Sequence, residues 1–494
     1  MGATMRLVRP SAVIIAAWAL LAILAGNASA IDFPGPDPGP ARAAIQGDTM
    51  TLENNVLRFT WSTAGARLKP KEFVDKLNGK TLTLSDSECF CVVLEESPSN
   101  TRSVKASQLR LLGEPEIPPI LPSAEVRVRS DGLSYPRFDG RVGKQVVVDL
   151  YEGGRGVRLV WVAALFDGGN YVLQRVQLVP RGRRESQISE VAFGEFGVPG
   201  ARPTGSVDGC PVVAGDIFFA SESPLAKHEI RESASVDGKR THVRSAFPID
   251  AGEDRWESVG ARFVMGVSPH GHLRRGFLYY LERERACPYR PFLHYNNGSE
   301  IGCDYWGKRL HKTAAEAEQF RMNQQELWLR NIRAIGDELV KKRKVKLDAF
   351  VHDFEWDDET LVWQFHRGYP NGFCPAADLA SHYGARVGVW FSPWGGYPCQ
   401  PARVKFGREM GFETSPGGLS LAGPRYYRRF STACANMIRQ YGANYFKFDG
   451  FAAGNNQPGA GPYVSDVEAL LRLAKVLHGP TARIAGKRDE RDVF

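Results

Sequence analysis

Strand-like and helix-like segments alternate along the chain after Pro291. Apolar residues recur every three to five positions within 311–344, which predicts a long helix. The segments that follow are strand 345–353, a weaker helix 375–383, strand 386–391, helix 426–441, strand 443–449 and helix 466–478. Strands that alternate with helices predict parallel βαβ units. Because each strand ends in polar or aromatic residues, the pattern favours a (β/α)8 TIM-type barrel.

The stretch before this alternation has a different sequence pattern. Residues 49–290 form short β-type runs that are broken by Gly, Pro, Asn and Asp, and we expect no helix among them. This pattern predicts an all-β sandwich. The expected fold class is therefore α/β plus β, with a sandwich domain at 49–290, a lead-in segment and helix at 291–344, and the N-terminal half of a (β/α) barrel at 345–494.

The N-terminus has the features of a signal peptide. Arg6 and Arg9 precede an almost wholly apolar run at 11–25, and small residues at 28–30 form a cleavage pattern. The apolar run is shorter than the roughly 20 residues that a membrane-spanning helix needs. We therefore expect a signal peptide at 1–30 with cleavage after Ala30, a secreted or periplasmic protein, and no membrane association after cleavage. The Pro/Gly-rich stretch 31–48 is expected to be a linker.

Charge and cysteine usage limit the possible partners. The formal net charge is +8, but the basic residues are scattered, and the densest run, at 341–344, closes a predicted helix. No basic stripe with interleaved aromatic residues is present, which disfavours nucleic acid as a partner. No spacing of cysteine and histidine resembles a zinc site, so we expect no metal and no cofactor. A disulfide between Cys374 and Cys399 is one conceivable pairing among the eight cysteines.

The last strand of the alternation carries a pair of charged residues. In the run 444–450, the side chains of Lys447 and Asp449 share one face and are followed by Gly450. At a barrel strand end, Asp449 suits the nucleophile of a retaining glycosidase, and Lys447 would keep it ionised and bind a sugar hydroxyl. The alternative is an ion pair on a solvated edge strand.

Further polar and aromatic residues follow the first and second barrel strands. Asp353 and Glu355 stand where the first strand ends and could bind sugar hydroxyls. Three tryptophans could line a sugar pocket, because an aromatic face receives the apolar side of a sugar; they are Trp356, Trp390 and Trp394. The alternative for each tryptophan is packing in the core. The neighbouring Asp357 and Asp358 are interpreted as helix-start residues.

These motifs resemble those of the melibiase-type α-galactosidases, which are retaining glycoside hydrolases of the family-36 kind. The resemblance rests on the runs 353–356, 388–394 and 445–449, with 290–296 similar to the lead-in to the barrel. It implies a β-sandwich followed by a catalytic (β/α)8 barrel and an oligosaccharide or glycoside as substrate. It also implies that Asp449 is the nucleophile, that Lys447 and Asp353 are galactose-hydroxyl ligands, and that Trp390 is part of the sugar pocket. The family often has two adjacent aspartates, glycine and tryptophan after the first strand, whereas Phe354 and Glu355 fill the second and third places here.

The stretch 345–494 is shorter than the roughly 250 residues of an eightfold barrel. We therefore expect a C-terminally truncated chain whose acid/base carboxylate would lie beyond Phe494 and which lacks most turnover. Two alternatives stay open. One is a non-catalytic carbohydrate-binding or structural protein derived from such an enzyme, and the other is an α-glycosidase of different sugar specificity, such as an α-glucosidase-like enzyme.

Overall fold

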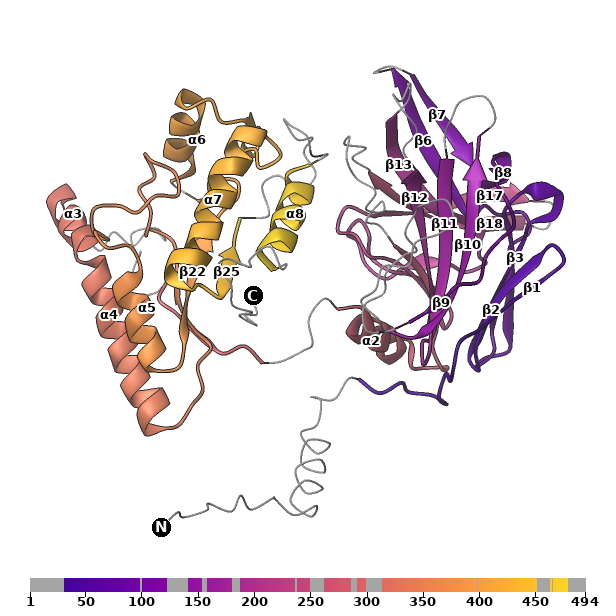
Figure 1. The fold of residues 1–494 in the computed structure, drawn as a ribbon, viewed down its shortest axis with the longest axis horizontal. Coiled ribbons are helices and arrows are strands. Elements are labelled where there is room, and N and C mark those ends of the chain that lie inside the picture. The colour runs from indigo at the N-terminus through magenta and orange to yellow at the C-terminus, as the bar shows by residue number, and fades with distance from the viewer. Residues whose placement is uncertain are drawn as a thin grey trace, which may run out of the picture. The chain divides into compact units, whose positions relative to one another are not determined.

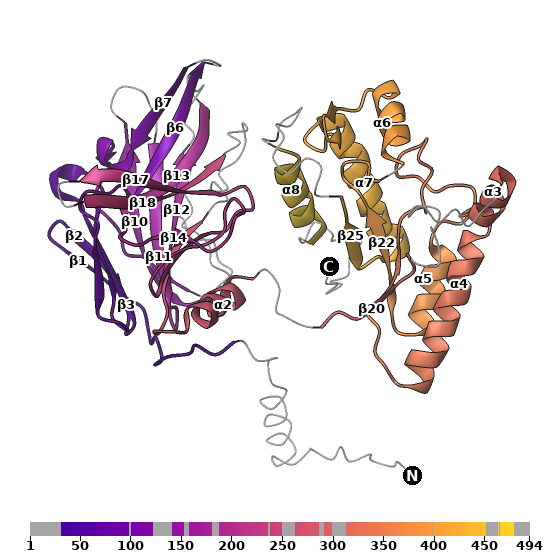
Figure 2. The ribbon, with the colours of Figure 1, turned by 180° about the vertical axis from the view of Figure 1, so that it is seen from behind.

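A computed structural model describes most of the chain (Figures 1 and 2). The described residues are 31–97, 100–121, 141–152, 158–179, 187–235, 238–248, 262–285, 291–298, 313–397, 399–450, 463 and 465–478. They divide into two compact units, Met1–Phe247 with Arg255–Arg290, and Pro248–Asp254 with Pro291–Phe494. The predicted signal peptide at 1–30 and the end of the chain at 479–494 lie outside the described residues. None of the helices in the described part has the length and apolar character needed to cross a membrane.

The described residues of the first unit form three β-sheets. The first has the order β1 (Arg42–Gln46), β2 (Thr49–Glu53), β3 (Leu57–Ser62), β4 (Lys69–Asp75), β5 (Lys80–Thr83). The second runs β14 (Arg202–Pro203), β15 (Val212–Ala214), β16 (Ile217–Ser221), β19 (Phe263–Val267), β12 (Tyr171–Val179), β11 (Arg158–Phe166), β10 (Gly143–Tyr151), β8 (Arg110–Leu111), with β9 (Pro119–Ile120) also paired to β10. The third runs β17 (Lys227–Ser235), β18 (Gly238–Pro248), β13 (Gln187–Gly197), β6 (Phe90–Ser97), β7 (Asn100–Lys105). Short 3₁₀ turns occupy Ala64–Ala66 and Ala106–Gln108.

The core of this unit lies where the inner faces of the three sheets meet. Trp61 of β3 packs edge-on against Trp161 of β11, with ring centroids 5.2 Å apart. Phe193 of β13 stacks on Phe263 of β19 at 5.9 Å, which joins the third sheet to the second. These strands pair antiparallel with their neighbours, for example β10 with β11. The predicted sandwich-like packing of antiparallel sheets is thus present.

Two elements of this unit differ from the sequence-based expectation. Part of the expected linker forms strand β1, because it pairs with β2 along its whole length. Helix α2 (Leu273–Glu284) lies in the region where no helix was expected, and this expectation was wrong. Its residues Leu273, Phe277 and Tyr280 recur at helical spacing and pack against the core around Phe218. This helix was missed from the sequence because its apolar periodicity is short and the segments before it all have strand-like patterns.

The second unit is built on a parallel sheet in the order β20 (His294–Asn296), β21 (Ala349–His352), β22 (Arg386–Phe391), β25 (Tyr445–Phe448). Its helices are α3 (Ala314–Met322), α4 (Gln324–Ile335), the π-helical turn η4 (Gly336–Lys342), α5 (Cys374–His382), α6 (Gln400–Glu409), α7 (Pro424–Tyr441) and α8 (Asp466–His478). A small hairpin joins β23 (Thr414–Ser415) to β24 (Gly418–Leu419). Helices α4 and α5 lie side by side, and α5 contacts β22.

The expected alternation of strands and helices is present, with several corrections to the predictions for this unit. The predicted helix 311–344 is divided at Asn323 into α3 and α4 and continues as the π-helical turn η4. The lead-in segment supplies a strand of the sheet, β20, because its backbone pairs parallel with β21. Helix α6 was not expected, and the loop-rich stretch 406–421 forms the β23–β24 hairpin rather than another parallel strand. The disulfide between Cys374 and Cys399 is absent, since both thiols are free.

A complete barrel is not described. The described sheet of the second unit has four parallel strands, and the remaining strands of an eightfold barrel stay a prediction. What these four strands do establish is which residues share the edge formed by their carboxyl ends.

Candidate active site

The carboxyl ends of β21, β22 and β25 bring the predicted site residues together. Asp353 follows β21, Trp390 lies near the end of β22, and Asp449 follows β25. Parallel strands place their carboxyl ends at one edge of the sheet, which is where catalytic residues of barrel enzymes lie. Trp390 and Lys447 are direct neighbours across the β22–β25 ladder, so their side chains share one face.

Lys447 joins the two aspartates. Its Nζ donates a hydrogen bond of 2.8 Å to Oδ2 of Asp353 and lies 4.0 Å from Oδ2 of Asp449. The Lys447 side chain is 36% exposed, whereas that of Asp353 is only 7% exposed. The Lys447 ammonium group is therefore held by the buried Asp353 carboxylate and remains accessible to a ligand.

Asp449 is held by three hydrogen-bond donors. Trp390 Nε1 donates to Oδ2 at 3.1 Å, the Tyr397 hydroxyl donates to Oδ1 at 2.8 Å, and the Gly450 amide donates to Oδ1 at 2.7 Å. Burial of the carboxylate pulls its pKa upward. The hydrogen bonds from Tyr397, Trp390 and Gly450, with the charge of Lys447, outweigh burial and hold the pKa of Asp449 below its usual value. The carboxylate is therefore ionised at neutral pH, as a nucleophile must be.

Asp353 is fixed by the amide of Phe354 and by the loop that follows strand β20. Its amide donates to Oδ1 of Asn297 at 2.8 Å, and its own Oδ1 accepts the Phe354 amide at 2.8 Å. A Cβ atom on Gly298 would lie 2.7 Å from Oδ2 of Asp353, so only glycine fits beside this oxygen. The loop after β20 thus contributes to the site although the sequence pointed only to its resemblance to a lead-in.

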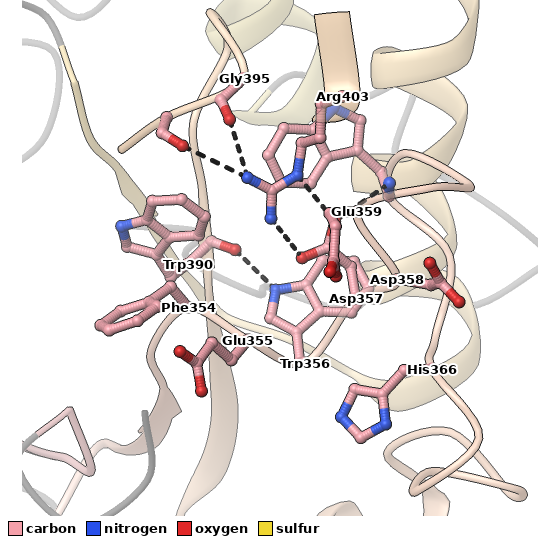
Figure 3. A network of polar contacts seen from close by, with 12 residues as sticks. Phe354, Glu355, Trp356, Asp357, Asp358, Glu359, His366, Trp390, Gly395 and Arg403 are labelled. Carbon is pink, nitrogen blue, oxygen red and sulfur yellow. Dashed lines mark hydrogen bonds and ion pairs between the residues drawn. The ribbon is translucent and has the colours of Figure 1, made fainter. Parts of the chain in front are cut away.

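A buried ion pair lies beside Trp390 (Figure 3). Arg403 of α6 binds Asp357 with two hydrogen bonds, Nη2 to Oδ1 at 2.8 Å and Nε to Oδ2 at 3.1 Å. The remaining Nη1 donates to the Gly395 carbonyl at 2.7 Å, and the guanidinium lies over the Trp363 ring, 4.7 Å from its centroid. Asp357 does not start a helix, so that interpretation was wrong. Its side chain is the buried partner of a cation supplied by α6.

Asp358 does not start a helix either. Its Oδ1 accepts hydrogen bonds from the amide and the hydroxyl of Thr360, at 2.9 and 2.6 Å. The side chain therefore stabilises a local turn in the loop after β21.

The other predicted ligands lie farther from this centre. Glu355 accepts a long hydrogen bond of 3.4 Å from Gln324 of α4 and has a positive φ of 70°. Trp356 is fully buried, and its Nε1 donates to the Trp390 carbonyl at 2.8 Å. Trp394 is also buried. Trp390 is equally buried, at 1% exposed. In this conformation Trp356, Trp390 and Trp394 expose no ring face to a sugar, which agrees with the core-packing alternative; a sugar contact by these residues or by Glu355 stays a prediction.

Sequence reasoning missed Tyr397 and Asn297. Tyr397 follows the glycine pair that ends the β22 segment, and its side chain reaches back to Asp449. An aromatic residue directly after two glycines was the available signal, but the direction of its side chain depends on the loop backbone. Asn297 carried no signal beyond its place after the lead-in strand.

The residue that precedes Asp353 in the chain, His352, is a buried histidine. His352 bonds through Nδ1 to the Asp353 carbonyl at 2.7 Å and through Nε2 to the Tyr369 hydroxyl. Burial lowers the pKa of His352 to about 4, so the imidazole is neutral at physiological pH. It supports the loop that carries Asp353. Among the described residues no cluster of three His, Cys, Asp or Glu side chains could hold a metal ion.

The fold is similar to that of solved α-galactosidases. The GH36 α-galactosidase AgaA from Geobacillus stearothermophilus, solved as a variant with 1-deoxygalactonojirimycin, aligns over 88% of this chain and 71% of its own, with a TM-score of 0.54 and 11% identity. The galactosidase domain of the α-galactosidase–sucrose kinase AgaSK aligns over 88% and 69%, with a TM-score of 0.53 and 11% identity. The α-galactosidase from Lactobacillus brevis aligns over 82% of this chain but only 64% of its own, at a TM-score of 0.49 and 10% identity. No family model and no curated protein sequence matches the chain. At this identity the likeness concerns the fold.

Proposed function

We propose that this protein is a retaining glycoside hydrolase for α-galactosides or related α-linked sugars, with Asp449 as its nucleophile. The observation that carries the proposal is the arrangement of Asp449, Lys447 and Asp353 at one edge of a parallel sheet. An ionised carboxylate lies beside an accessible ammonium group that is itself anchored by a second, buried carboxylate. The likeness of the fold to solved α-galactosidases supports the substrate class.

The proposed reaction is a double displacement. Asp449 attacks the anomeric carbon and forms a covalent glycosyl–enzyme intermediate, which water then hydrolyses. Lys447 and Asp353 bind sugar hydroxyls from the side, since the pair offers both a donor and an acceptor within 2.8 Å of each other. Trp390 orients the nucleophile through its Nε1 hydrogen bond.

The acid/base group of this mechanism is not assigned to any described carboxylate. The test of the nucleophile must therefore avoid the need for an acid. A fluoride leaving group departs without protonation, so glycosyl transfer from a glycosyl fluoride to Asp449 depends on the nucleophile and on sugar binding alone.

The experiment is covalent labelling of the full chain with 5-fluoro-α-D-galactosyl fluoride, followed by peptide mass spectrometry. We expect a single adduct on the peptide that contains Asp449, and no adduct in Asp449→Asn. Competition by galactose, but not by glucose, would assign the sugar, and the reverse result would assign an α-glucosidase-like specificity. If wild type gives no adduct while galactosides still bind, the protein is a carbohydrate-binding protein rather than a hydrolase.

A further inference from the structure

Tyr397 occupies an unusual place beside the proposed nucleophile. Its side chain is partly exposed, with the residue 41% accessible, yet its hydroxyl donates a 2.8 Å hydrogen bond to Oδ1 of Asp449. Its ring also stacks on Trp390, with centroids 6.3 Å apart and an interplanar angle of 28°. Two aromatic residues, Trp390 within β22 and Tyr397 in the loop after it, thus hold the two oxygens of one carboxylate, Tyr397 on Oδ1 and Trp390 on Oδ2.

The two oxygens of Asp449 are not equivalent. Oδ1 accepts from both the Tyr397 hydroxyl and the Gly450 amide, which uses its two in-plane lone pairs. Oδ2 accepts from Trp390 Nε1 and keeps its second lone pair on the side of Lys447, whose Nζ is 4.0 Å away. Attack on a sugar bound by Lys447 therefore has to come from Oδ2.

The loop that carries Tyr397 is held by the buried ion pair of Arg403 and Asp357. Gly395, Gly396 and Tyr397 all have positive φ values, of 92°, 43° and 44°, and such a run needs external support for a non-glycine residue. Arg403 supplies it, because its Nη1 donates to the Gly395 carbonyl at 2.7 Å while Asp357 holds the rest of the guanidinium. Figure 3 shows this network beside Trp390. The backbone of Gly395 and Gly396, and with it the Tyr397 hydroxyl, is thereby held in place.

We propose that Tyr397 is the positioning residue of the nucleophile: its hydroxyl holds Oδ1 of Asp449 and leaves Oδ2 as the attacking oxygen. This inference rests on the proposed function. In the step itself, a lone pair of Oδ2 forms the bond to the anomeric carbon while the bond to the leaving group breaks with its electron pair. The Tyr397 proton stays on the phenol throughout.

A purely structural role for Tyr397 makes a different prediction. If the ring only packs on Trp390, removal of the hydroxyl changes nothing, because Tyr397→Phe keeps the ring. If the hydroxyl positions and stabilises the carboxylate, its removal raises the pKa of Asp449 and slows attack. A hydrogen bond to a charged group at a partly exposed site corresponds to a rate effect of about tenfold.

The experiment compares Tyr397→Phe with wild type and with a matched control, Tyr427→Phe. Tyr427 lies on α7, where its ring packs on Tyr463, and the control likewise removes one hydroxyl and keeps a ring. The first readout is the rate of labelling by 5-fluoro-α-D-galactosyl fluoride as a function of pH. We expect labelling of Tyr397→Phe to be about tenfold slower, with its acid limb at higher pH than in wild type, and the control to behave as wild type.

The second readout needs no turnover. The carboxyl carbon of Asp449 is followed by ¹³C NMR in protein labelled at aspartate, with Asp449→Asn to assign the signal. We expect its titration midpoint to rise in Tyr397→Phe and not in Tyr427→Phe. An unchanged midpoint, or an unchanged labelling rate and pH profile, overturns the inference. A wild-type protein that is not labelled, but whose midpoint shifts in Tyr397→Phe, overturns the proposed function and leaves the hydrogen bond to Asp449 supported.

Discussion

The buried pair of Asp357 and Arg403 gives the sharpest prediction about stability. The side chains of Asp357 and Arg403 are almost inaccessible, at 0% and 3% exposed. The guanidinium donates hydrogen bonds to both oxygens of Asp357 and to the Gly395 carbonyl. Asp357→Asn keeps the shape of the side chain but removes its charge, which leaves the Arg403 charge buried without compensation. Breaking one partner of a buried pair costs about 3–5 kcal/mol. That is a large part of the roughly 5–15 kcal/mol by which a domain is stable.

Urea denaturation, followed by tryptophan fluorescence, measures this loss. With an m-value of about 2 kcal/mol/M, a loss of about 3–5 kcal/mol lowers the unfolding midpoint by roughly 1.5–2.5 M. The double variant Asp357→Leu, Arg403→Met should recover most of the loss, since an apolar pair of similar volume avoids the desolvation of two charges. Glu338→Gln is the matched control, because Glu338 pairs with Lys342 and Arg343 in an exposed position and its loss should not move the midpoint.

Two results would refute this reasoning. The first is a midpoint for Asp357→Asn within experimental error of wild type, which would mean that Arg403 finds water or another acceptor. The second is a double variant no more stable than the single one, which would mean that packing around Trp363, rather than charge, dominates at this position. Either result would also weaken the argument that Arg403 fixes the loop before Tyr397.

Two further predictions concern protonation. Lys447→Met removes a cation that lowers the pKa of Asp449, so the acid limb of labelling should move to higher pH, and labelling should slow because Asp353 loses its partner; an unchanged pH–rate profile would contradict the role of Lys447. Burial lowers the pKa of His352 from 6.5 to about 4. Between these pH values the unfolded chain binds a proton at His352 and the native state does not. The free energy of unfolding therefore decreases as pH falls from about 6.5 to about 4. In His352→Asn the free energy of unfolding, measured by urea titration at several pH values, should fall less over this window than in wild type.

The regular elements of the second unit were largely predictable from sequence. Strand β22 and helix α8 agree with their predicted residues, and β21 and β25 lie inside the predicted strands. These segments have strong apolar periodicity, and glycines mark some of their ends, such as Gly450 after β25 and Gly479 after α8 in the sequence. Strand β20 was not predicted, because three residues carry too little pattern and its pairing with β21 decides its conformation.

The loops of the site were predictable in residue type but not in direction. The sequence indicated that Asp353, Trp390, Lys447 and Asp449 belong together, and the structure brings them within hydrogen-bonding or ion-pair contact of one another. It could not distinguish these from Trp356, which also stands after a strand end but whose indole nitrogen donates to the Trp390 carbonyl and not to Asp449. Which way such a side chain turns depends on backbone angles in the loop and on partners far along the chain.

The hydrogen bond between Trp390 and Asp449 depends on close strand packing at Gly388, which the spacing of residues in the sequence does not indicate. In β22, Gly388 lies between β21 and β25, and a Cβ atom there would be 2.8 Å from Cγ2 of Val351 and 3.0 Å from Cβ of Tyr445. Only glycine lets both neighbouring strands approach at this level. Because Gly388 pairs with Tyr445, Trp390 pairs with Lys447, and its indole nitrogen then lies within reach of the carboxylate two residues later. The geometry of the nucleophile is therefore set inside the sheet as well as in the loops, by the absence of a side chain at Gly388.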